Sequence, residues 1–281
     1  MIEIKAYAKI NLTLDIGSRR PNGYHNIESV MQSVSLYDTV SVGRGGLNRI
    51  RVSSNASYLP NDERNTAFQA ATLFFKHTGL AAQADIRIDK KIPSRAGMGG
   101  GSSDAAAVLW GLNELHQTGL SLPELMRLGV RVGADVPFCL AGGTCLCRGI
   151  GEKITRVDPM PACTLLICKP PAGISTPRAY GLVDKLPVPA AGATPKMLTA
   201  LKSGALHNVA AALSNRFDEV TLLSQVQNIK KLLRQNSALN AMMTGSGSAV
   251  YGIFEDAGHA KACVPKLRGC GEIFLAQPVN V

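Results

Sequence analysis

The sequence predicts an α+β protein of two domains, and three observations lead to this prediction. Apolar and polar residues alternate from Ile2 to Ile16, which predicts that the chain opens with a strand. Helical spacing of apolar residues returns further along, most clearly over residues 105–115. The length of 281 residues corresponds to two domains of ordinary size, and 46% apolar residues is typical of a chain that folds around a core.

The first half of the chain predicts a meander of strands followed by helices. In the opening strand Lys9 and Asn11 lie on one face, about 7 Å apart, because side chains two positions apart in a strand point the same way. Ser121 and Glu124 have the spacing of a capping box at a helix start. Further strands are expected at residues 30–42, 50–52, 84–92 and 144–155, and helices at residues 65–77, 105–115 and 121–132.

The second half predicts a different order of elements. An apolar strand at 164–169 ends at Pro170-Pro171, and residues 187–195, rich in Pro, Ala and Gly, are expected to form an exposed loop. We place the domain boundary near residue 160, which gives domains 1–160 and 161–281. Helices are then expected at about 195–213, 220–235 and 257–267, and strands before Gly245, at 249–254 and at 272–276.

Composition excludes several classes of protein. No uncharged apolar run reaches the roughly 18 residues of a membrane-spanning helix, and the N-terminus lacks the pattern of a secretory signal. The seven cysteines are odd in number and lie mostly in apolar stretches, which favours reduced thiols and the cytosol. The net charge of +10 is spread over the chain, with 16 basic and 12 acidic residues in 1–150 and 14 and 8 in 151–281. We therefore expect no membrane or nucleic-acid partner, and an RNA-binding protein without catalysis is a remote alternative.

The segment Pro93–Ala107, PSRAGMGGGSSDAAA, has the strongest chemical signal. Backbone N–H groups at a helix start carry a partial positive charge, and glycines let a phosphate approach them closely. The segment therefore predicts a phosphate-binding loop. It has no Lys after its glycines, and Ser102 stands where a dinucleotide-binding motif has its third glycine, which disfavours two large nucleotide folds. A flexible loop with a serine N-cap is the structural alternative.

Two further features are candidates for the same site. Asp135 stands in the apolar stretch GADVPF, where a carboxylate needs a partner, and Lys9 is a candidate for a catalytic dyad with it. The alternatives are a helix N-cap for Asp135 and a solvated strand lysine for Lys9. The loop Gly245-Ser246-Gly247-Ser248 is either an ordinary turn or a second wall around the phosphates. No His-rich metal pattern is present, so a zinc site is not expected.

These motifs together resemble the GHMP kinase superfamily, and the resemblance covers essentially the whole chain. It rests on KAYAKINLTLDI, RRPNGYHNIESVMQSVSLYD, PSRAGMGGGSSDAAA, GADVPFCLAGG and MTGSGSAVYGIF. It implies an N-terminal domain like domain 2 of ribosomal protein S5 and a C-terminal ferredoxin-like α/β sandwich. It also implies ATP- and Mg²⁺-dependent phosphorylation of the 2-hydroxyl of 4-diphosphocytidyl-2-C-methyl-D-erythritol, in the non-mevalonate route to isopentenyl diphosphate.

The resemblance also implies a role for each site residue. Asp135 matches the general base and Lys9 its cationic neighbour. Asn65 matches a position near the adenosine, and Tyr24 with His25 would frame the cytosine. The ATP site would comprise Asn65, Pro93, Ala96, Gly97, Met98, Gly99, Gly100, Gly101, Ser102 and Ser103. The substrate site would comprise Asn11, Tyr24, His25, Thr176, Tyr180, Gly245 and Ser246.

Some expectations stay open at this point. The Mg²⁺ ligands are not indicated, although Ser103 is a candidate. Met98 replaces the usual Leu of the phosphate loop, and Met31 stands where some relatives carry an aromatic residue near the cytidine. A homoserine- or mevalonate-type kinase is the alternative, which Tyr24-His25 argues against because those substrates have no nucleobase. The expected partners are small molecules, and the chain is expected to be a monomer or a homodimer.

Overall fold

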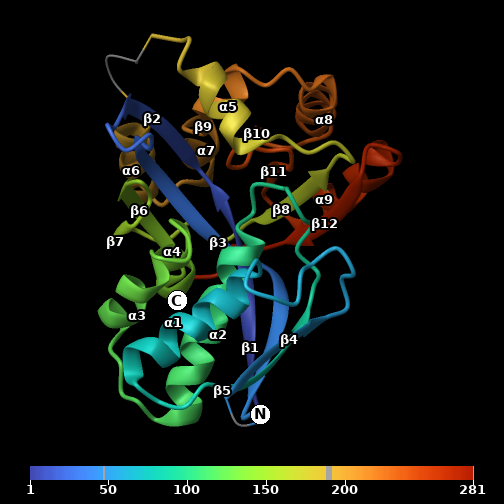
Figure 1. Ribbon diagram of the computed structural model, residues 1–281. Helices are drawn as coiled ribbons and strands as arrows, with labels where there is room; N and C mark the ends of the chain where they lie inside the picture. Colours follow the sequence, from blue (N-terminus) through green and yellow to red (C-terminus); the bar gives the residue numbers. More distant parts are fainter. Residues whose placement is uncertain (47, 188–191, 281) are drawn as a thin grey trace. The chain divides into compact units, whose positions relative to one another are not determined.

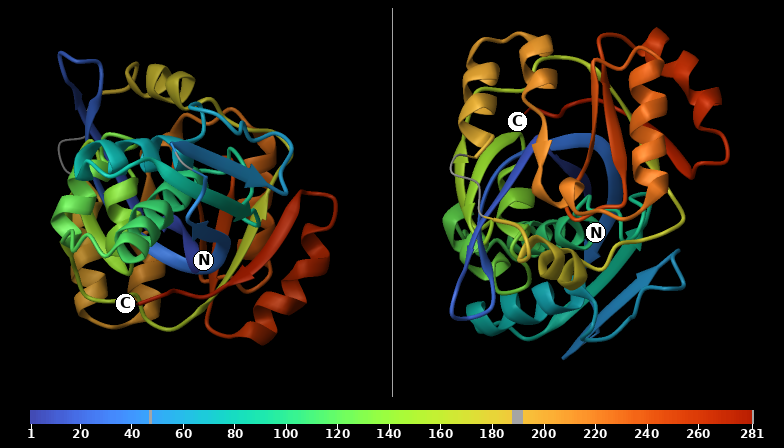
Figure 2. Two further views of the ribbon diagram at one scale, coloured as in Figure 1. Left: turned by 60° about the horizontal axis from the view of Figure 1, so that its bottom comes forward. Right: turned by 90° about the horizontal axis from the view of Figure 1, so that it is seen from above.

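A computed structural model describes residues 1–46, 48–187 and 192–280 (Figures 1 and 2). Helices and strands are mixed along the chain, which confirms the α+β class. Two compact units are present, neither of them a continuous segment. Unit 1 comprises Met1–Ala8, Tyr37–Ile92 and Gly99–Ala141, and unit 2 comprises Lys9–Leu36, Pro93–Met98 and Gly142–Val281. The expected boundary near residue 160 therefore lies inside unit 2.

Unit 1 combines strands from the first third of the chain with four helices. The end of β3 (His25–Gly43) pairs antiparallel with β5 (Gln83–Asp89), and β5 pairs parallel with β4 (Arg49–Ser54). The unit also holds most of β1 (Ile2–Asn11). Its helices are α1 (Thr66–Thr78), α2 (Gly100–His116), α3 (Leu122–Gly129) and α4 (Val136–Ala141).

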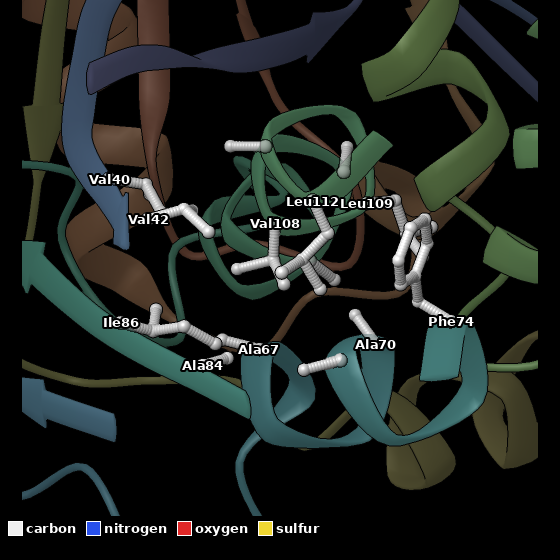
Figure 3. Packing of buried hydrophobic residues seen from close by; sticks show 14 of the residues in the cluster. Val40, Val42, Ala67, Ala70, Phe74, Ala84, Ile86, Val108, Leu109 and Leu112 are labelled. Atoms are coloured by element: carbon white, nitrogen blue, oxygen red, sulfur yellow. The ribbon is translucent and has the colours of Figure 1, made fainter. Parts of the chain in front are cut away.

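Helix α2 is fixed by an apolar core that includes strands and α1. Val108, Leu109 and Leu112 are buried in one cluster with β3, β5 and α1 (Figure 3). Each fully buried aliphatic side chain stabilises such a core by about 1.5–3 kcal/mol. Gly111 lies so close to Ile4 that an added Cβ would come within 2.7 Å of its Cδ1. Because α2 is held along its length, its first residues, from Gly100 on, have a defined position in unit 1.

In unit 2 the first part of β3 pairs antiparallel with β2 (Thr13–Arg19) and β6 (Thr144–Gly149). β6 forms a hairpin with β7 (Lys153–Arg156), and β2 pairs parallel with β9 (Ser214–Asn215). The connecting helices are α5 (Thr176–Val183), α6 (Thr194–Lys202), α7 (Leu206–Ala211) and the 3₁₀ helix η1 (Arg216–Glu219).

The rest of unit 2 has the predicted ferredoxin-like arrangement. A four-stranded antiparallel sheet has the order β10-β11-β8-β12. Helices α8 and α9 pack on it (Figure 2, right). Apart from the elements inserted between β8 and α8 and the short η2, the order β8-α8-β10-β11-α9-β12 is that of a split βαβ fold. The bounds are β8 (Thr164–Lys169), α8 (Ser224–Gln235), β10 (Asn240–Met243), β11 (Val250–Phe254), α9 (Ala257–Cys263), the 3₁₀ helix η2 (Val264–Leu267) and β12 (Glu272–Ala276).

Several predicted elements are divided by local breaks. The opening strand is two strands, β1 and β2, separated at Leu12. The single strand expected at 144–155 is a hairpin, because Gly149 and Gly151 adopt positive φ between its two arms. The helix expected at 195–213 is two helices, since Gly204 has positive φ after α6.

Other predictions differ in extent. Helix α2 begins at Gly100, five residues earlier than its apolar spacing indicated, and α5 was not predicted. The loop expected at 187–195 falls partly on residues 188–191, outside the described part of the chain, and α6 already begins at Thr194. Among the residues that the structure describes, no helix has the length and hydrophobicity needed to cross a membrane.

Candidate active site

The glycine segment continues from a tight turn into the start of α2. Gly97 has φ +75°, and a Cβ there would lie 2.1 Å from the carbonyl oxygen of Thr244. The N-cap of α2 is Gly99, in the left-handed region at φ 72°, and no side chain of the described residues caps this end. The serine N-cap alternative is therefore wrong. The first N–H groups of α2 remain available to an anion, which is the arrangement that helix starts offer to phosphates.

In unit 1 three residues assigned to the ATP site also have structural contacts. Thr66 Oγ1 donates to the carbonyl oxygen of Gly101 at 2.8 Å, which ties α1 to the start of α2. Asn65 is the buried N-cap of α1, with its Oδ1 accepting from Ala67 N at 2.9 Å. Ser103 Oγ donates to the carbonyl oxygen of Tyr7, so the proton of this hydroxyl is already engaged in a hydrogen bond within the protein. The binding roles of Asn65, Gly101 and Ser103 stay predictions.

Asp135 lies in unit 1 directly before α4. Its carbonyl oxygen accepts from Cys139 N at 3.0 Å, so Asp135 occupies the position from which α4 begins. The side chain is half-buried. The preceding Gly133 faces Ser102, whose Oγ lies 3.6 Å from the position of a Cβ on that glycine. Unit 1 therefore places the backbone two residues before the candidate base beside Ser102, which follows the glycines.

In unit 2 a buried polar network joins three segments that the sequence singled out. Lys9 and Asn11 are 4% and 1% exposed, and Lys9 Nζ donates to Asn11 Oδ1 at 2.7 Å. The same oxygen accepts from Gly245 N at 3.0 Å. Lys9 N donates to the carbonyl oxygen of Met98 at 3.0 Å. The expectation that Lys9 and Asn11 share a face is confirmed, but the face is buried rather than solvated.

The loop Gly245–Ser248 lies against the first part of the glycine segment. Ala249 N donates to the carbonyl oxygen of Ala96 at 3.1 Å, and Thr244 Oγ1 lies 3.3 Å from that of Gly97. Asn215 holds the loop from the other side by donating to the carbonyl oxygen of Gly245 at 2.8 Å. These contacts bring the two glycine loops together at one place, and the role of the second loop as a wall around the phosphates stays a prediction.

Two neighbouring pockets of unit 2 hold most of the expected substrate residues. The loop pocket, about 610 Å³, is lined by both glycine loops and the start of α5: Arg95, Gly97, Gly173, Ile174, Ser175, Thr176, Ser246 and Gly247. The aromatic pocket, about 550 Å³, is lined by Arg19, Asn22, Gly23, Tyr24, His25, Thr176, Pro177, Tyr180, Gly181 and Asp184. Thr176 lines both pockets, and Thr176 Oγ1 lies 2.8 Å from Ser246 Oγ.

Stacked rings form one side of the aromatic pocket. His25 stacks on Tyr180 with centroids 4.7 Å apart and planes inclined by 13°, and Tyr180 meets Phe217 edge-on at 4.8 Å. His25 Nε2 lies 2.6 Å from Asp184 Oδ1. Tyr24 is 58% exposed. The pocket therefore offers flat apolar surfaces and polar edges, which suits a planar heteroaromatic ring.

Sequence reasoning missed three residues of this site. Thr244 bonds to Asn11 and Gly97, and its place directly before the second glycine loop was an available signal. Arg95 lines the loop pocket, and its place inside the glycine segment was also visible. Asp184 gave no signal, because its contact with His25 spans 159 positions.

A dedicated metal centre is not built by the residues that the structure describes. They contain no group of three or more His, Cys, Asp or Glu side chains that could hold a metal ion. Ser103, the candidate for Mg²⁺, does not fit that role, because its hydroxyl is buried and bonded to the backbone of β1.

Comparison with known proteins matches both halves of the chain. The model described as GHMP kinases N terminal domain matches residues 65–143, and that described as GHMP kinases C terminal matches residues 197–272. A 4-diphosphocytidyl-2-C-methyl-D-erythritol kinase of Caldicellulosiruptor saccharolyticus is 42% identical over 267 residues, which cover 94% of this chain and 92% of the relative.

Solved structures agree with these matches. The crystal structure of a 4-(cytidine 5'-diphospho)-2C-methyl-D-erythritol kinase has a TM-score of 0.82 and 29% identity, with all of both chains covered. A homoserine kinase from Cytophaga hutchinsonii has a TM-score of 0.79 at 18% identity, covering 98% of this chain and 94% of its own. This second likeness shows the fold alone.

Proposed function

This chain belongs to the GHMP kinases, in the family of the 4-diphosphocytidyl-2-C-methyl-D-erythritol kinases, and on this premise we propose the reaction that it catalyses. It transfers the γ-phosphoryl group of ATP to the 2-hydroxyl of 4-diphosphocytidyl-2-C-methyl-D-erythritol, giving the 2-phosphate and ADP, in the non-mevalonate route to isopentenyl diphosphate. The observation that carries the proposal is the pair of pockets meeting at Thr176, one aromatic and one formed by glycine loops.

The cytidylated substrate would extend through both pockets. Its cytosine would enter the aromatic pocket beside Tyr24, His25 and Tyr180. Its diphosphate would pass the start of α5 at Thr176, where helix N–H groups favour negative charge. The methylerythritol would then reach Ser246 in the loop pocket and the neighbouring Gly245 and Asn11.

ATP would bind through its phosphates at the start of α2. The uncapped N–H groups after Gly99 and the positive-φ glycines permit close approach of phosphate oxygens. The remaining ATP residues would be the flanking segment from Pro93 and Asn65 near the adenosine. Phosphoryl transfer needs mostly positioning and charge stabilisation, so a rigid backbone cradle suits the reaction.

Proton transfer is assigned to Asp135. Its carboxylate would accept the proton of the 2-hydroxyl as that oxygen bonds to the γ-phosphorus, while the bond from the γ-phosphorus to the bridging oxygen of ADP breaks. Lys9 would offset negative charge on the transferred group, and its ammonium is held by Asn11 Oδ1. The pairing of Lys9 with Asp135 as a dyad stays a prediction.

Mg²⁺ is proposed to reach the protein on the phosphates of ATP. This small cation keeps several waters and takes only one or two protein oxygens when phosphates supply the rest. When bound, it would neutralise part of the phosphate charge.

A homoserine- or mevalonate-type kinase is the alternative within the same fold. The aromatic pocket argues against it, because a substrate without a nucleobase has no planar ring to bind beside the stacked rings of His25 and Tyr180. We also propose that the chain works in the cytoplasm on small molecules, without nucleic acid or a membrane, as a monomer or homodimer. Burial raises the pKa of the Cys163 and Cys168 thiols to about 12, which keeps them protonated in such a compartment.

An assay of ADP release with separate candidate alcohols tests the reaction. Turnover is expected with 4-diphosphocytidyl-2-C-methyl-D-erythritol and not with homoserine or mevalonate, and equal turnover with either would contradict the proposal. Asp135→Asn preserves shape but removes the base, so kcat is expected to fall by about 10²–10⁴. A variant that keeps both its melting temperature and most of its kcat would refute the role of Asp135.

A further inference from the structure

A buried ionic cluster of unit 1 lies beside the start of α2. It consists of Asp38, Lys90 and Asp104, whose side chains are 0%, 8% and 4% exposed. Lys90 Nζ donates to Asp38 Oδ2 and, at 2.7 Å, to Asp104 Oδ2. Two carboxylates thus share one ammonium group away from water, where an uncompensated charge is costly.

The two carboxylates have unequal surroundings. Asp38 Oδ1 accepts from Lys91 N at 2.5 Å and from Ile92 N at 2.8 Å, so with Lys90 this carboxylate has three donors. Asp104 has only Lys90, and its Oδ1 is buried with no partner among the described residues. Donors favour the ionised form of a carboxylate and burial favours its neutral form. Asp38 is therefore the ionised member and Asp104 the member that carries a proton.

The electrostatics of the cluster agree with this assignment. Burial raises the pKa of Asp104 to about 7, helped by the charge of Asp38 and opposed by that of Lys90. These two are the charged groups that face Asp104, one from β3 and one from the segment after β5. With Asp104 ionised the cluster has a net charge of −1, and with Asp104 protonated it is neutral.

The cluster also joins the backbone directly before the glycine segment to the part of that segment that forms α2. Asp38 binds the backbone of Lys91 and Ile92, directly before Pro93, and Asp104 is the fifth residue of α2. Lys90 Nζ lies 3.3 Å from the position of a Cβ on Gly100, the first residue of α2. A charge on the cluster therefore acts on the turn to which ATP phosphates would bind.

We propose that Asp38, Lys90 and Asp104 are positioning residues of the phosphate-binding turn, and that Asp104 holds a proton when ATP binds. An ionised Asp104 would repel the phosphates at short range through a poorly screened interior. ATP affinity therefore falls as pH rises through about 7. The ATP part of this proposal rests on the proposed function, whereas the protonation of Asp104 does not.

Two isosteric variants separate the carboxylates. Asp104→Asn imitates the protonated form, so its KM for ATP at pH 6.5 is expected to stay within about threefold of wild type. In wild type the KM for ATP should rise several-fold between pH 6.5 and 8.5. Because one proton is involved, the rise cannot exceed about tenfold per pH unit. In Asp104→Asn this rise should disappear. In Asp38→Asn the NH₂ group of the amide replaces a carboxylate oxygen, so at least one of the three donors loses its acceptor. The melting temperature should therefore fall by about 4 °C or more.

Melting without nucleotide tests the cluster independently of the reaction. Because the folded pKa of Asp104 lies above its unfolded value, folding binds a proton, and this contribution to stability is lost as pH rises through about 7. The melting temperature of Asp104→Asn should therefore rise relative to wild type between pH 5 and pH 8. The exposed Asp158→Asn is the control and should follow wild type at every pH.

Two results would overturn the proposal. One is Asp104→Asn losing as much stability as Asp38→Asn, which would make Asp104 an ionised partner of Lys90. The other is Asp104→Asn keeping the wild-type pH dependence of the KM for ATP. Absence of ATP turnover in wild type at every pH would refute the proposed function instead, and the melting comparison would still decide which carboxylate carries the proton.

Discussion

At the scale of single residues, Lys9 and Asn11 form a buried polar pair that segments distant in sequence hold in place. Period-2 alternation placed Lys9 and Asn11 together, and their side chains do bond to each other. Their burial was not visible, because a polar side of a strand normally faces water. The donors and acceptors that make burial possible come from Met98, Thr244 and Gly245, which are distant in sequence. A polar face that is buried is therefore recognisable only once its partners are known.

Asp184 provides a prediction at this scale. It holds His25, which stacks on Tyr180 in the aromatic pocket, through a contact of 2.6 Å. The pair is partly exposed, with the Asp184 side chain 37% accessible, so its strength is about 1 kcal/mol or less. In Asp184→Asn the KM for the cytidylated substrate should rise by up to about fivefold, while kcat and the KM for ATP stay near wild type.

The neighbouring Lys185→Met is the matched control, because Lys185 is also exposed and does not line the pocket. It should leave all three kinetic constants unchanged. An unchanged KM for the cytidylated substrate in Asp184→Asn would show that the ring of His25 needs no anchor. A parallel rise in the KM for ATP would indicate general loss of structure instead.

At the scale of elements, periodic patterns predicted strands well and their interruptions less well. β8 and β12 begin and end where the sequence placed them, because apolar runs are bounded there by proline or glycine. Glycines with positive φ divided the strand at 144–155 and the helix at 195–213. The sequence does not distinguish a glycine that ends a helix or strand from a glycine inside one, because the two differ only in backbone conformation.

Gly97 provides a prediction about such an element. An added Cβ would meet the carbonyl oxygen of Thr244 at 2.1 Å, in a residue whose φ is already +75°. Gly97→Ala must therefore move one glycine loop away from the other, at a cost of about 2–5 kcal/mol in free energy of unfolding. ATP-dependent turnover should fall with it, because both loops line the same pocket.

Gly204→Ala is the matched control, since Gly204 has φ +65° but nothing within 4 Å of a Cβ. It should cost only the strain of the left-handed conformation, about 1–2 kcal/mol, and leave turnover intact. The free energy of unfolding in urea and the kcat are measured for Gly97→Ala and Gly204→Ala and compared with those of wild type. Equal losses of stability would mean that the close approach to Thr244 contributes nothing beyond backbone strain.

At the scale of the whole molecule, the sequence predicted two domains but not the composition of the compact units. The ferredoxin-like sheet was expected from the resemblance and is present. The units themselves are discontinuous, because β1 and β3 each continue from one unit into the other, at Ala8 and at Leu36. No local pattern marks the boundary in β1, since its alternation runs through Ala8 and Lys9 without a break.

Net charge provides the prediction for the whole molecule. The chain has a charge of +10, and both proposed substrates carry several phosphate charges. Long-range attraction of this kind raises the rate of encounter and is screened by salt, with a Debye length of about 30 Å at 0.01 M and about 10 Å at 0.1 M. We therefore expect kcat/KM for ATP to fall several-fold between about 0.02 and 0.3 M NaCl, while kcat changes by less than about twofold.

Potassium acetate at the same ionic strengths distinguishes screening from competition by chloride. Screening depends on ionic strength alone, so the two salts should give the same dependence. Sulfate is unsuitable for this comparison, because it would compete for the helix start that we propose to bind the phosphates of ATP. A kcat/KM that does not change with either salt would show that the dispersed charge has no part in substrate capture. Recognition would then rest on local groups, namely the backbone of the glycine loops and Lys9, a buried residue whose ammonium group donates to Asn11 Oδ1.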